Sequence, residues 1–163
     1  QLEQLPDDVQ ILVVSTGGND VLVQTEVLGD AVSTVGEALL LLDDAVGQFR
    51  EDYCQMLEAV AATDFQSYIC TIYRPDFPDE EFQRMTSTAP GLFNDVIVEE
   101  ASLRLLPILD IRAIFTDSGD YANPIEPSVQ GGQKLADEIA GLIDDWGLST
   151  NRGSLIISEK EVN

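Results

Sequence analysis

The chain alternates short apolar runs with longer segments in which apolar residues recur every three or four positions. The apolar runs are rich in β-branched and aromatic residues, which predicts strands at residues 9–14, 65–73 and 108–115. The recurring spacing predicts helices at residues 27–62, 92–106 and 129–147, the first of which is either continuous or broken near Gly47. Ser128 is placed to cap the last helix, and two prolines after residue 73 predict an irregular loop to about residue 90.

Strand and helix follow each other three times, which is the order of an α/β protein. We therefore predict a three-layer α/β/α domain with a parallel sheet over residues 1–147. Residues 148–163 form a tail in which the apolar residues 155–157 are unassigned. Functional loops of parallel sheets lie at the carboxyl ends of the strands. The loops of interest are therefore residues 15–20, 73–78 and 116–127.

Charge narrows the range of partners. Thirty acidic and eight basic residues give a net charge of −22, a field that repels phosphate groups and disfavours a nucleic-acid-binding protein. The acids are spread along the chain as pairs, which favours a solvated acidic surface over a dedicated binding patch. Such a surface suits a saline environment or a cationic partner, and the sequence neither chooses between them nor names a compartment. The longest apolar run, residues 38–42, is too short to span a membrane.

The chain contains no histidine, which excludes a histidine-based catalytic triad and a histidine-ligated metal. Cys54 and Cys70 are the only cysteines, so a structural zinc site is nearly excluded, and two buried thiols are favoured over a disulfide. Four oxygen ligands in the 116–127 loop could suit a hard cation, but their spacing of three lacks the alternate ligands of a calcium-binding loop. These are Asp117, Asp120, Asn123 and Glu126. We predict no metal and no cofactor.

Two of the loops carry recognisable motifs. After the first strand, Gly17 and Gly18 permit a tight backbone turn, and Asn19 can aim an amide donor at an anionic oxygen, with Asp20 next to it. The second motif, Asn-Pro-Ile-Glu-Pro-Ser at residues 123–128, precedes a helix. Together the two resemble the last two sequence blocks of the SGNH hydrolase superfamily, the GDSL-type lipases and esterases, which read Gly-x-Asn-Asp and Asp-x-x-His-Pro-Ser.

The resemblance implies a flavodoxin-like fold, acyl ester hydrolysis and a role for each matching residue. Asn19 takes the place of the oxyanion donor, and Gly17, Gly18 and Asp20 belong to the same substrate-binding loop. In the second motif the catalytic residues differ from the family pattern. Asn123 stands at the position of the aspartate, and Glu126 stands at the position of the histidine.

The family's first two blocks, which supply the serine nucleophile and a glycine donor, precede the Gly-x-Asn-Asp block. Here Gly17 follows only sixteen residues, so neither block fits. The family's first strand would lie beside residues 9–14, and its absence leaves a ladder edge unpaired. We therefore expect an upstream segment, a strand from another chain or a rebuilt sheet. Residues 1–8 lack the basic start and apolar stretch of a signal peptide. The first residue is Gln1 rather than Met, which is typical of a processed or cut end and favours the upstream segment.

Hydrolysis would need a base, and Glu126 is the ionisable residue at that position. A glutamate has an ordinary pKa of about 4.3, so burial or a neighbouring carboxylate such as Asp120 would have to raise it. The alternative is that both acids belong to a solvated loop. Ser15, Ser118 and Ser128 have the positions of turn and cap residues rather than of a nucleophile.

Two hypotheses remain. One is an altered esterase for small esters, whose serine lies outside this chain and which uses Asn19 and Glu126. The other is a catalytically inactive scaffold whose acidic surface and unpaired sheet edge contact another protein chain. For the chain itself we favour the scaffold, because every covalent step lacks a residue.

Overall fold

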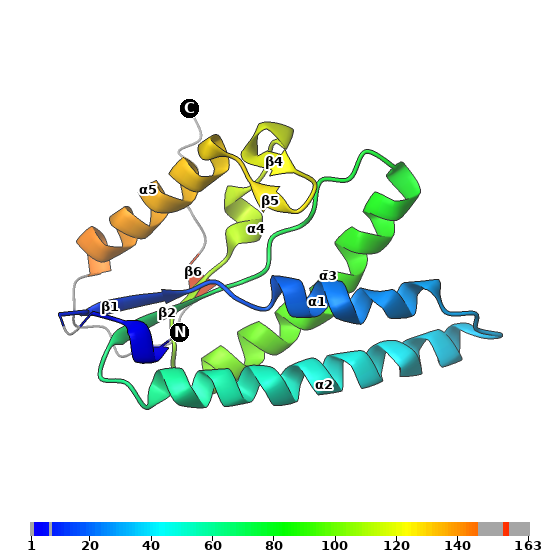
Figure 1. The fold of residues 1–163 in the computed structure, drawn as a ribbon, viewed down its shortest axis with the longest axis horizontal. Helices are drawn as coiled ribbons and strands as arrows, with labels where there is room; N and C mark the ends of the chain where they lie inside the picture. Colours follow the sequence, from blue (N-terminus) through cyan, green and yellow to red (C-terminus); the bar gives the residue numbers. More distant parts are fainter. Residues whose placement is uncertain (1, 7, 147–154, 157–163) are drawn as a thin grey trace.

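The computed structural model describes residues 2–6, 8–146 and 155–156, and its fold is mixed α/β (Figure 1). Its helices are α1 (Gly18–Gln24), α2 (Val35–Ala61), α3 (Glu80–Leu103), α4 (Ile111–Ile114) and α5 (Val129–Trp146), with short 3-10 helices at Leu2–Gln4, Thr25–Gly29 and Ser118–Asp120. Its strands are β1 (Ile11–Val14), β2 (Gln66–Cys70), β3 (Ile108–Leu109), β4 (Tyr121–Asn123), β5 (Glu126–Pro127) and β6 (Leu155–Ile156). No helix within the described ranges is both long and apolar enough to cross a membrane.

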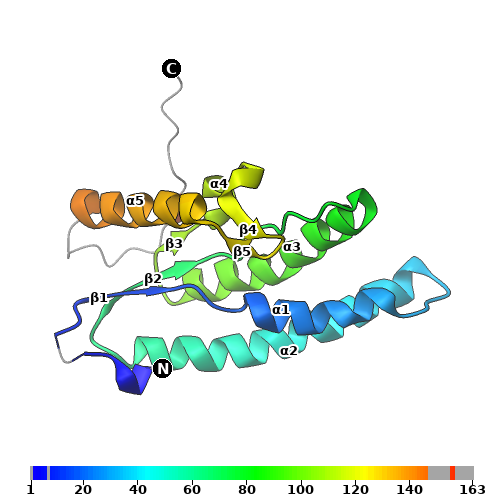
Figure 2. The ribbon, with the colours of Figure 1, turned by 45° about the horizontal axis from the view of Figure 1, so that its top comes forward.

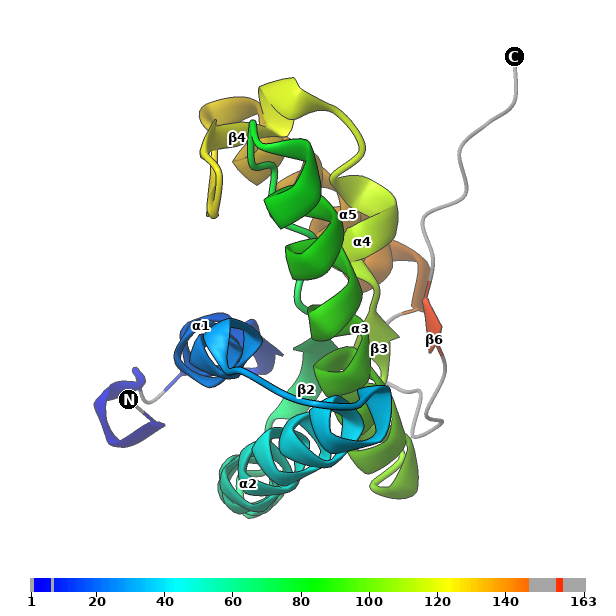
Figure 3. The ribbon, with the colours of Figure 1, turned by 90° about the vertical axis from the view of Figure 1, so that its right-hand side faces the viewer.

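A parallel sheet lies at the centre, with the strand order β1-β2-β3-β6. In the register, Val14 of β1 lies opposite Ile69 of β2, and Ile69 in turn lies opposite Ile108 of β3. The predicted α/β class and parallel sheet are therefore confirmed. β1 stands at the end of this order, and within the described residues its one strand partner is β2. Figure 3 shows α1, which follows β1, and β6 on opposite sides of the molecule.

Two apolar clusters, one on each face of the sheet, form the core. Successive residues of a strand point to opposite faces, and accordingly Ile69 and Cys70 of β2 belong to different clusters. Ile69 packs among side chains of α2 and α3, whereas Cys70 packs among side chains of α4 and α5. Figure 2 shows these helices above and below the strands, so the sheet is the middle of three layers.

α2 is continuous and starts later than the periodicity predicts. Its N-cap is Thr34, whose hydroxyl accepts a hydrogen bond from the Glu37 amide at 3.1 Å. The Glu37 carboxylate accepts one from the Ser33 amide at 2.7 Å. The helix passes through Gly47 without a break. An isolated glycine costs a helix about 1 kcal/mol, and the buried face of α2 outweighs that cost. That face consists of Ala45, Phe49, Tyr53, Leu57 and Val60.

The predicted irregular loop up to residue 90 is wrong, because α3 already begins at Glu80. The Asp79 carboxylate caps the helix by accepting a hydrogen bond from the Phe82 amide at 2.8 Å. Pro90 lies inside the helix and is buried. A proline removes a backbone donor from a helix, and here the packing of α3 against the sheet tolerates that loss. The helix also ends before the predicted residue 106, in a turn where Leu105 takes a φ of +58°.

The third strand is also shorter than predicted. β3 has two residues, and α4 occupies half of the range 108–115. The cause is Asp110, whose carboxylate accepts a hydrogen bond from the Arg112 amide at 3.2 Å and from the Thr71 hydroxyl at 2.8 Å. This cap starts a helical turn directly after the strand.

The predicted tail contains one paired element. Leu155 lies opposite Ile108 in a parallel pair, so part of the segment that the sequence left unassigned belongs to the sheet. The predicted helix end at Gly147 and the remaining tail residues lie outside the described residues.

Candidate functional site

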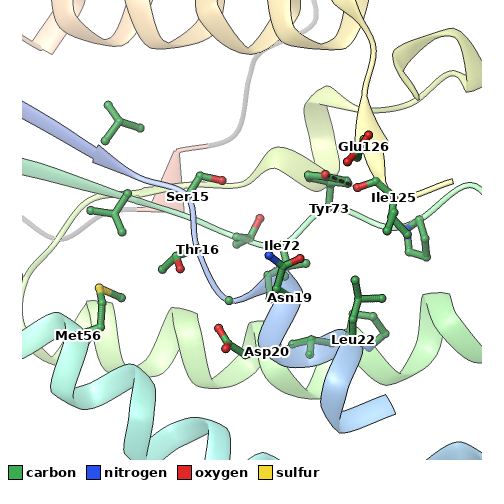
Figure 4. Close-up of a pocket in the computed structure, with 18 of the residues that line it drawn as sticks. Ser15, Thr16, Asn19, Asp20, Leu22, Met56, Ile72, Tyr73, Ile125 and Glu126 are labelled. Carbon is green, nitrogen blue, oxygen red and sulfur yellow. Dashed lines mark hydrogen bonds between the residues drawn. The ribbon is translucent and has the colours of Figure 1, made fainter. Parts of the chain in front are cut away.

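A cleft of about 750 Å³ opens at the carboxyl edge of the sheet (Figure 4). Its lining comes from the segments after β1 and β2, from the β4–β5 hairpin, and from side chains of α2 and α3. The three loops that the sequence singles out therefore meet at one place. We call residues 15–22 the glycine-turn wall, and residues 73–78 together with 120–127 the hairpin wall.

The glycine-turn wall depends on Gly17. Its φ is +99°, a conformation that L side chains rarely adopt, and an added Cβ would lie 3.1 Å from the Phe49 ring. Its carbonyl accepts a hydrogen bond from the Val21 amide at 2.9 Å, which starts α1, and Val21 anchors that helix in the core. Gly18 has open space around the position of a Cβ. The motif therefore contains one glycine that the backbone requires and one that it does not.

Asn19 and Asp20 lie in the first turn of α1, and both line the cleft. Both side chains are exposed, and neither makes a hydrogen bond or ion pair within the described part of the chain. Figure 4 shows Asn19 below Tyr73 in the cleft and Asp20 farther towards α2. The Asn19 amide is thus available to a ligand.

The hairpin wall is held from behind by polar contacts. As the chain leaves β2, the buried Asn94 side chain accepts a hydrogen bond from the Ile72 amide at 2.7 Å and donates one to the Ile72 carbonyl at 2.8 Å. Gln83 of α3 similarly accepts from the Phe77 amide and donates to the Pro75 carbonyl, both at 2.7 Å. These two amide side chains satisfy backbone groups that no strand pairs.

Two tyrosines and one backbone bond join the two parts of this wall. Tyr73 donates to the Ile125 carbonyl at 2.7 Å, and Tyr121 donates to the Arg74 carbonyl at 2.7 Å. The Asp76 amide donates to the Pro124 carbonyl at 2.8 Å. Burial raises the pKa of Tyr121 to about 12; burial, followed by the charge of Glu126, also raises the pKa of Tyr73. Both phenols are therefore neutral hydrogen-bond donors near pH 7.

Asp120 anchors the base of the hairpin. Its carboxylate is fully buried and accepts hydrogen bonds from Lys134 at 2.6 Å and from the amides of Thr116 and Asp117 at 3.0 Å. Burial opposes the charge, but these bonds and one from Gln130 outweigh it and lower the pKa of Asp120 to about 2. The Asp120 carbonyl also accepts from the Ser128 amide at 2.8 Å. Asp120 is therefore a structural carboxylate, and the alternative of a solvated loop does not apply to it, because its side chain is buried and paired.

Asn123 and Glu126 are brought together at the tip of the hairpin. The Asn123 amide donates to the Glu126 carboxylate at 2.6 Å. The Asn123 side-chain oxygen accepts from the backbone amides of Ile125 and Glu126, both at 3.0 Å. Glu126 lines the cleft, whereas Asn123 does not. Glu126 is exposed, so the burial that a glutamate base would require is missing.

Ser128 has the role that its sequence position indicates. The Ser128 hydroxyl accepts a hydrogen bond from the Gly131 amide at 3.1 Å, which confirms it as a cap of α5, and it donates to the Gly119 carbonyl at 2.6 Å. Ser15 lines the cleft and has no hydrogen-bond partner within the described residues. The hydroxyl of Thr71 does contact a carboxylate, that of Asp110, but Asp110 is committed to an ion pair with Arg112 at 2.6 Å.

Cys54 and Cys70 are free thiols in the structure, as the sequence favours. Burial raises the pKa of Cys70 to about 12, and burial also raises that of Cys54, so both resist forming the reactive thiolate. Among the described residues, no group of three or more cysteine and acidic side chains could hold a metal ion.

Tyr73, Tyr121 and Asn94 are site residues that sequence reasoning missed. Tyr73 directly follows the second apolar run, which is a usable signal for a side chain at the carboxyl edge of a sheet. Asn94 lies within a helical pattern, and nothing local marks it. Its partner, Ile72, is 22 residues away along the chain.

Comparison with known proteins leaves the site to be interpreted from its geometry. No protein-family model, no curated protein and no solved structure matches the chain.

Proposed function

We propose that this chain is an SGNH hydrolase-like scaffold that binds a ligand in its cleft and does not hydrolyse esters by itself. One observation carries the proposal. The cleft presents Asn19 and Glu126, the motif residues at the oxyanion-donor and base positions, but Glu126 is exposed and hydrogen-bonded to Asn123. Within the described residues, no serine hydroxyl is hydrogen-bonded to a carboxylate.

The fold supports the proposal as far as its topology goes. A parallel sheet in consecutive order, with the Gly-Gly-Asn-Asp turn after β1 and the Asn-Pro-Ile-Glu hairpin before the last helix, is compatible with the fold that the resemblance implies. Acyl transfer needs an activated nucleophile as well as an oxyanion donor. A cleft that has the oxyanion donor but no activated nucleophile can bind a ligand without hydrolysing it.

The test is hydrolysis of short-chain p-nitrophenyl esters by the purified chain. We expect the same background rate for this chain, for Ser15→Ala and for Glu126→Gln. Turnover by this chain that survives Ser15→Ala and disappears in Glu126→Gln would overturn the proposal, because it would show that Glu126 acts as a base.

A second candidate function is an altered esterase for small esters, whose serine comes from residues outside these 163. The edge of β1 that has no strand partner among the described residues favours it. All four residues of β1 are half-buried, and Leu12, Val13 and Val14 line the cleft, so a strand added at that edge would end beside Asn19. Assaying the product of the complete open reading frame beside this chain distinguishes the two. Ester turnover confined to the longer product would favour the esterase, and inactivity of both would favour the scaffold.

A partner protein is part of the scaffold hypothesis. β1 offers one unpaired edge within the described residues, and strand addition at such an edge is a common mode of recognition. The net charge of −22 favours a basic partner.

A further inference from the structure

The distribution of charge inside the cleft is one-sided. Asp20 and Glu126 are the two carboxylates among the described residues that line it, and that lining contains no lysine or arginine. No described cation lines the cleft: Arg74, in the hairpin wall, and Arg84 are exposed outside the lining, and the other four are paired. Arg50 and Arg104 pair with acids of α3, Arg112 pairs with Asp110, and Lys134 pairs with Asp120.

This distribution selects against anionic ligands. A carboxylate or phosphate group in the cleft would face Asp20 and Glu126 without a counter-charge, in a protein that already carries a net charge of −22. A cationic group would gain from both carboxylates. It would also gain from aromatic rings, which attract ammonium groups to their faces. Tyr73, Phe77 and Phe82 supply three such rings to the lining.

Part of the remaining lining is apolar. Leu22, Phe82 and Pro90 contribute apolar lining from α1 and the first half of α3, and Figure 4 shows Leu22 and Asp20 on opposite sides of Asn19. Leu22 and Phe82 remain 40% and 43% exposed, so apolar surface is open to a ligand at this end. A volume of about 750 Å³ lies within the range of small-molecule sites.

We propose that the cleft binds a cationic amphiphile, an amine or quaternary ammonium whose head group lies between Asp20 and Glu126 and whose apolar tail follows Leu22 and Phe82. The inference rests on the proposed function, since both use the same cleft, and it adds the chemical class of the ligand. Asn19, Ser15 and Thr16 offer polar groups to a hydroxyl or ester group next to the ammonium.

The experiment is isothermal titration calorimetry of the purified chain with three ten-carbon amphiphiles: decyltrimethylammonium, decyl sulfate and decyl maltoside. Each stays below its micelle concentration, and 0.3 M NaCl screens the general surface field. We expect one molecule of the ammonium compound to bind per chain, about tenfold more tightly than the other two. Tetramethylammonium alone should bind more weakly, because it lacks the tail.

Variants locate the site. Asp20→Asn and Glu126→Gln should each weaken ammonium binding by about threefold, the size of one exposed ion pair. Glu51→Gln and Asp44→Asn are matched controls, since both are exposed carboxylates of α2 outside the cleft, and they should leave the affinity unchanged. Equal losses in all four variants would overturn the inference, because the surface as a whole would then attract the cation.

The other outcomes separate this inference from the proposed function. Equal affinity for all three amphiphiles overturns the charge preference and leaves the cleft as a binding site. Binding of none of them overturns both. Ester turnover by the chain overturns the inactive scaffold and leaves the ligand class standing.

Discussion

The two walls of the cleft are built differently. The hairpin wall is fastened by side chains of α3 and α5, and the buried Asp120 carboxylate at its base pairs with Lys134. The glycine-turn wall has one core anchor, Val21, and follows a strand that pairs on one side within the described residues. Its polar side chains, Asn19 and Asp20, face the cleft without partners in the described chain. One wall is preorganised, and the other is left to interact with a ligand or an added strand.

The largest effect should come from removing the anchor of the hairpin wall. Asp120→Ala removes the closer of the two carboxylates that pair with Lys134 and the buried acceptor of two backbone amides, so we expect a loss of about 3 kcal/mol in the free energy of unfolding. Urea unfolding followed by circular dichroism measures it. Asp117→Ala is the control, because Asp117 is exposed and pairs with the same lysine at 3.1 Å, and it should cost less than about 1 kcal/mol. Similar losses in both variants would show that Asp120 is not the anchor.

The same carboxylate predicts a pH dependence. Its pKa falls from an ordinary 3.8 to about 2 in the folded chain, so the unfolded chain takes up the proton first as the pH falls. The stability that Asp120 contributes is therefore complete above about pH 4 and is lost between about pH 4 and pH 2. Asp120→Asn should flatten the pH dependence of unfolding in that window while the other acids still titrate. An unchanged slope would contradict the assignment.

The stability of the glycine-turn wall should depend on Gly17, the glycine whose backbone conformation other residues rarely adopt. Gly17→Ala places a Cβ 3.1 Å from Phe49 at a φ of +99°, and we expect a loss of about 2 kcal/mol in unfolding free energy. Gly18→Ala has open space and lies in α1, so it should be neutral within about 0.5 kcal/mol. Thermal unfolding of the pair gives the difference. If Gly18→Ala is the more damaging variant, the turn has a different conformation.

The smallest loss of stability should come from the two tyrosine hydrogen bonds that join the two segments of the hairpin wall. Tyr73→Phe removes one hydrogen bond, to the Ile125 carbonyl, and should cost about 1 kcal/mol in unfolding free energy. Tyr121→Phe removes the reciprocal bond to Arg74 and should cost a similar amount. Both bonds join the same two segments of the hairpin wall. The loss in unfolding free energy of the double variant should therefore differ from the sum of the losses in the single variants. Strict additivity in urea unfolding would show that the two bonds act independently.

The sequence predicted the α/β class, the parallel sheet, the three loops of the cleft and the Ser128 cap, because periodicity, β-branched runs and capping residues act over a few neighbouring positions. The sequence misplaced the ends of helices and strands where a contact between residues far apart in the chain determines them. Pro90 looks like a helix breaker until α3 packs on the sheet, and the end of the third strand depends on Thr71, which is 39 residues from Asp110.

The candidate site divides in the same way. The Gly-Gly-Asn-Asp turn and the pairing of Asn123 with Glu126 follow from residues close together in the chain, so the sequence alone specifies them. Whether an acid is a solvated ligand contact or a buried anchor depends on what surrounds it in three dimensions. The tertiary structure made Asp120 an anchor by placing Lys134 against it, and it left Glu126 exposed on the cleft. Burial and charge pairing are long-range properties, which is why local sequence could name these two carboxylates but not distinguish their roles.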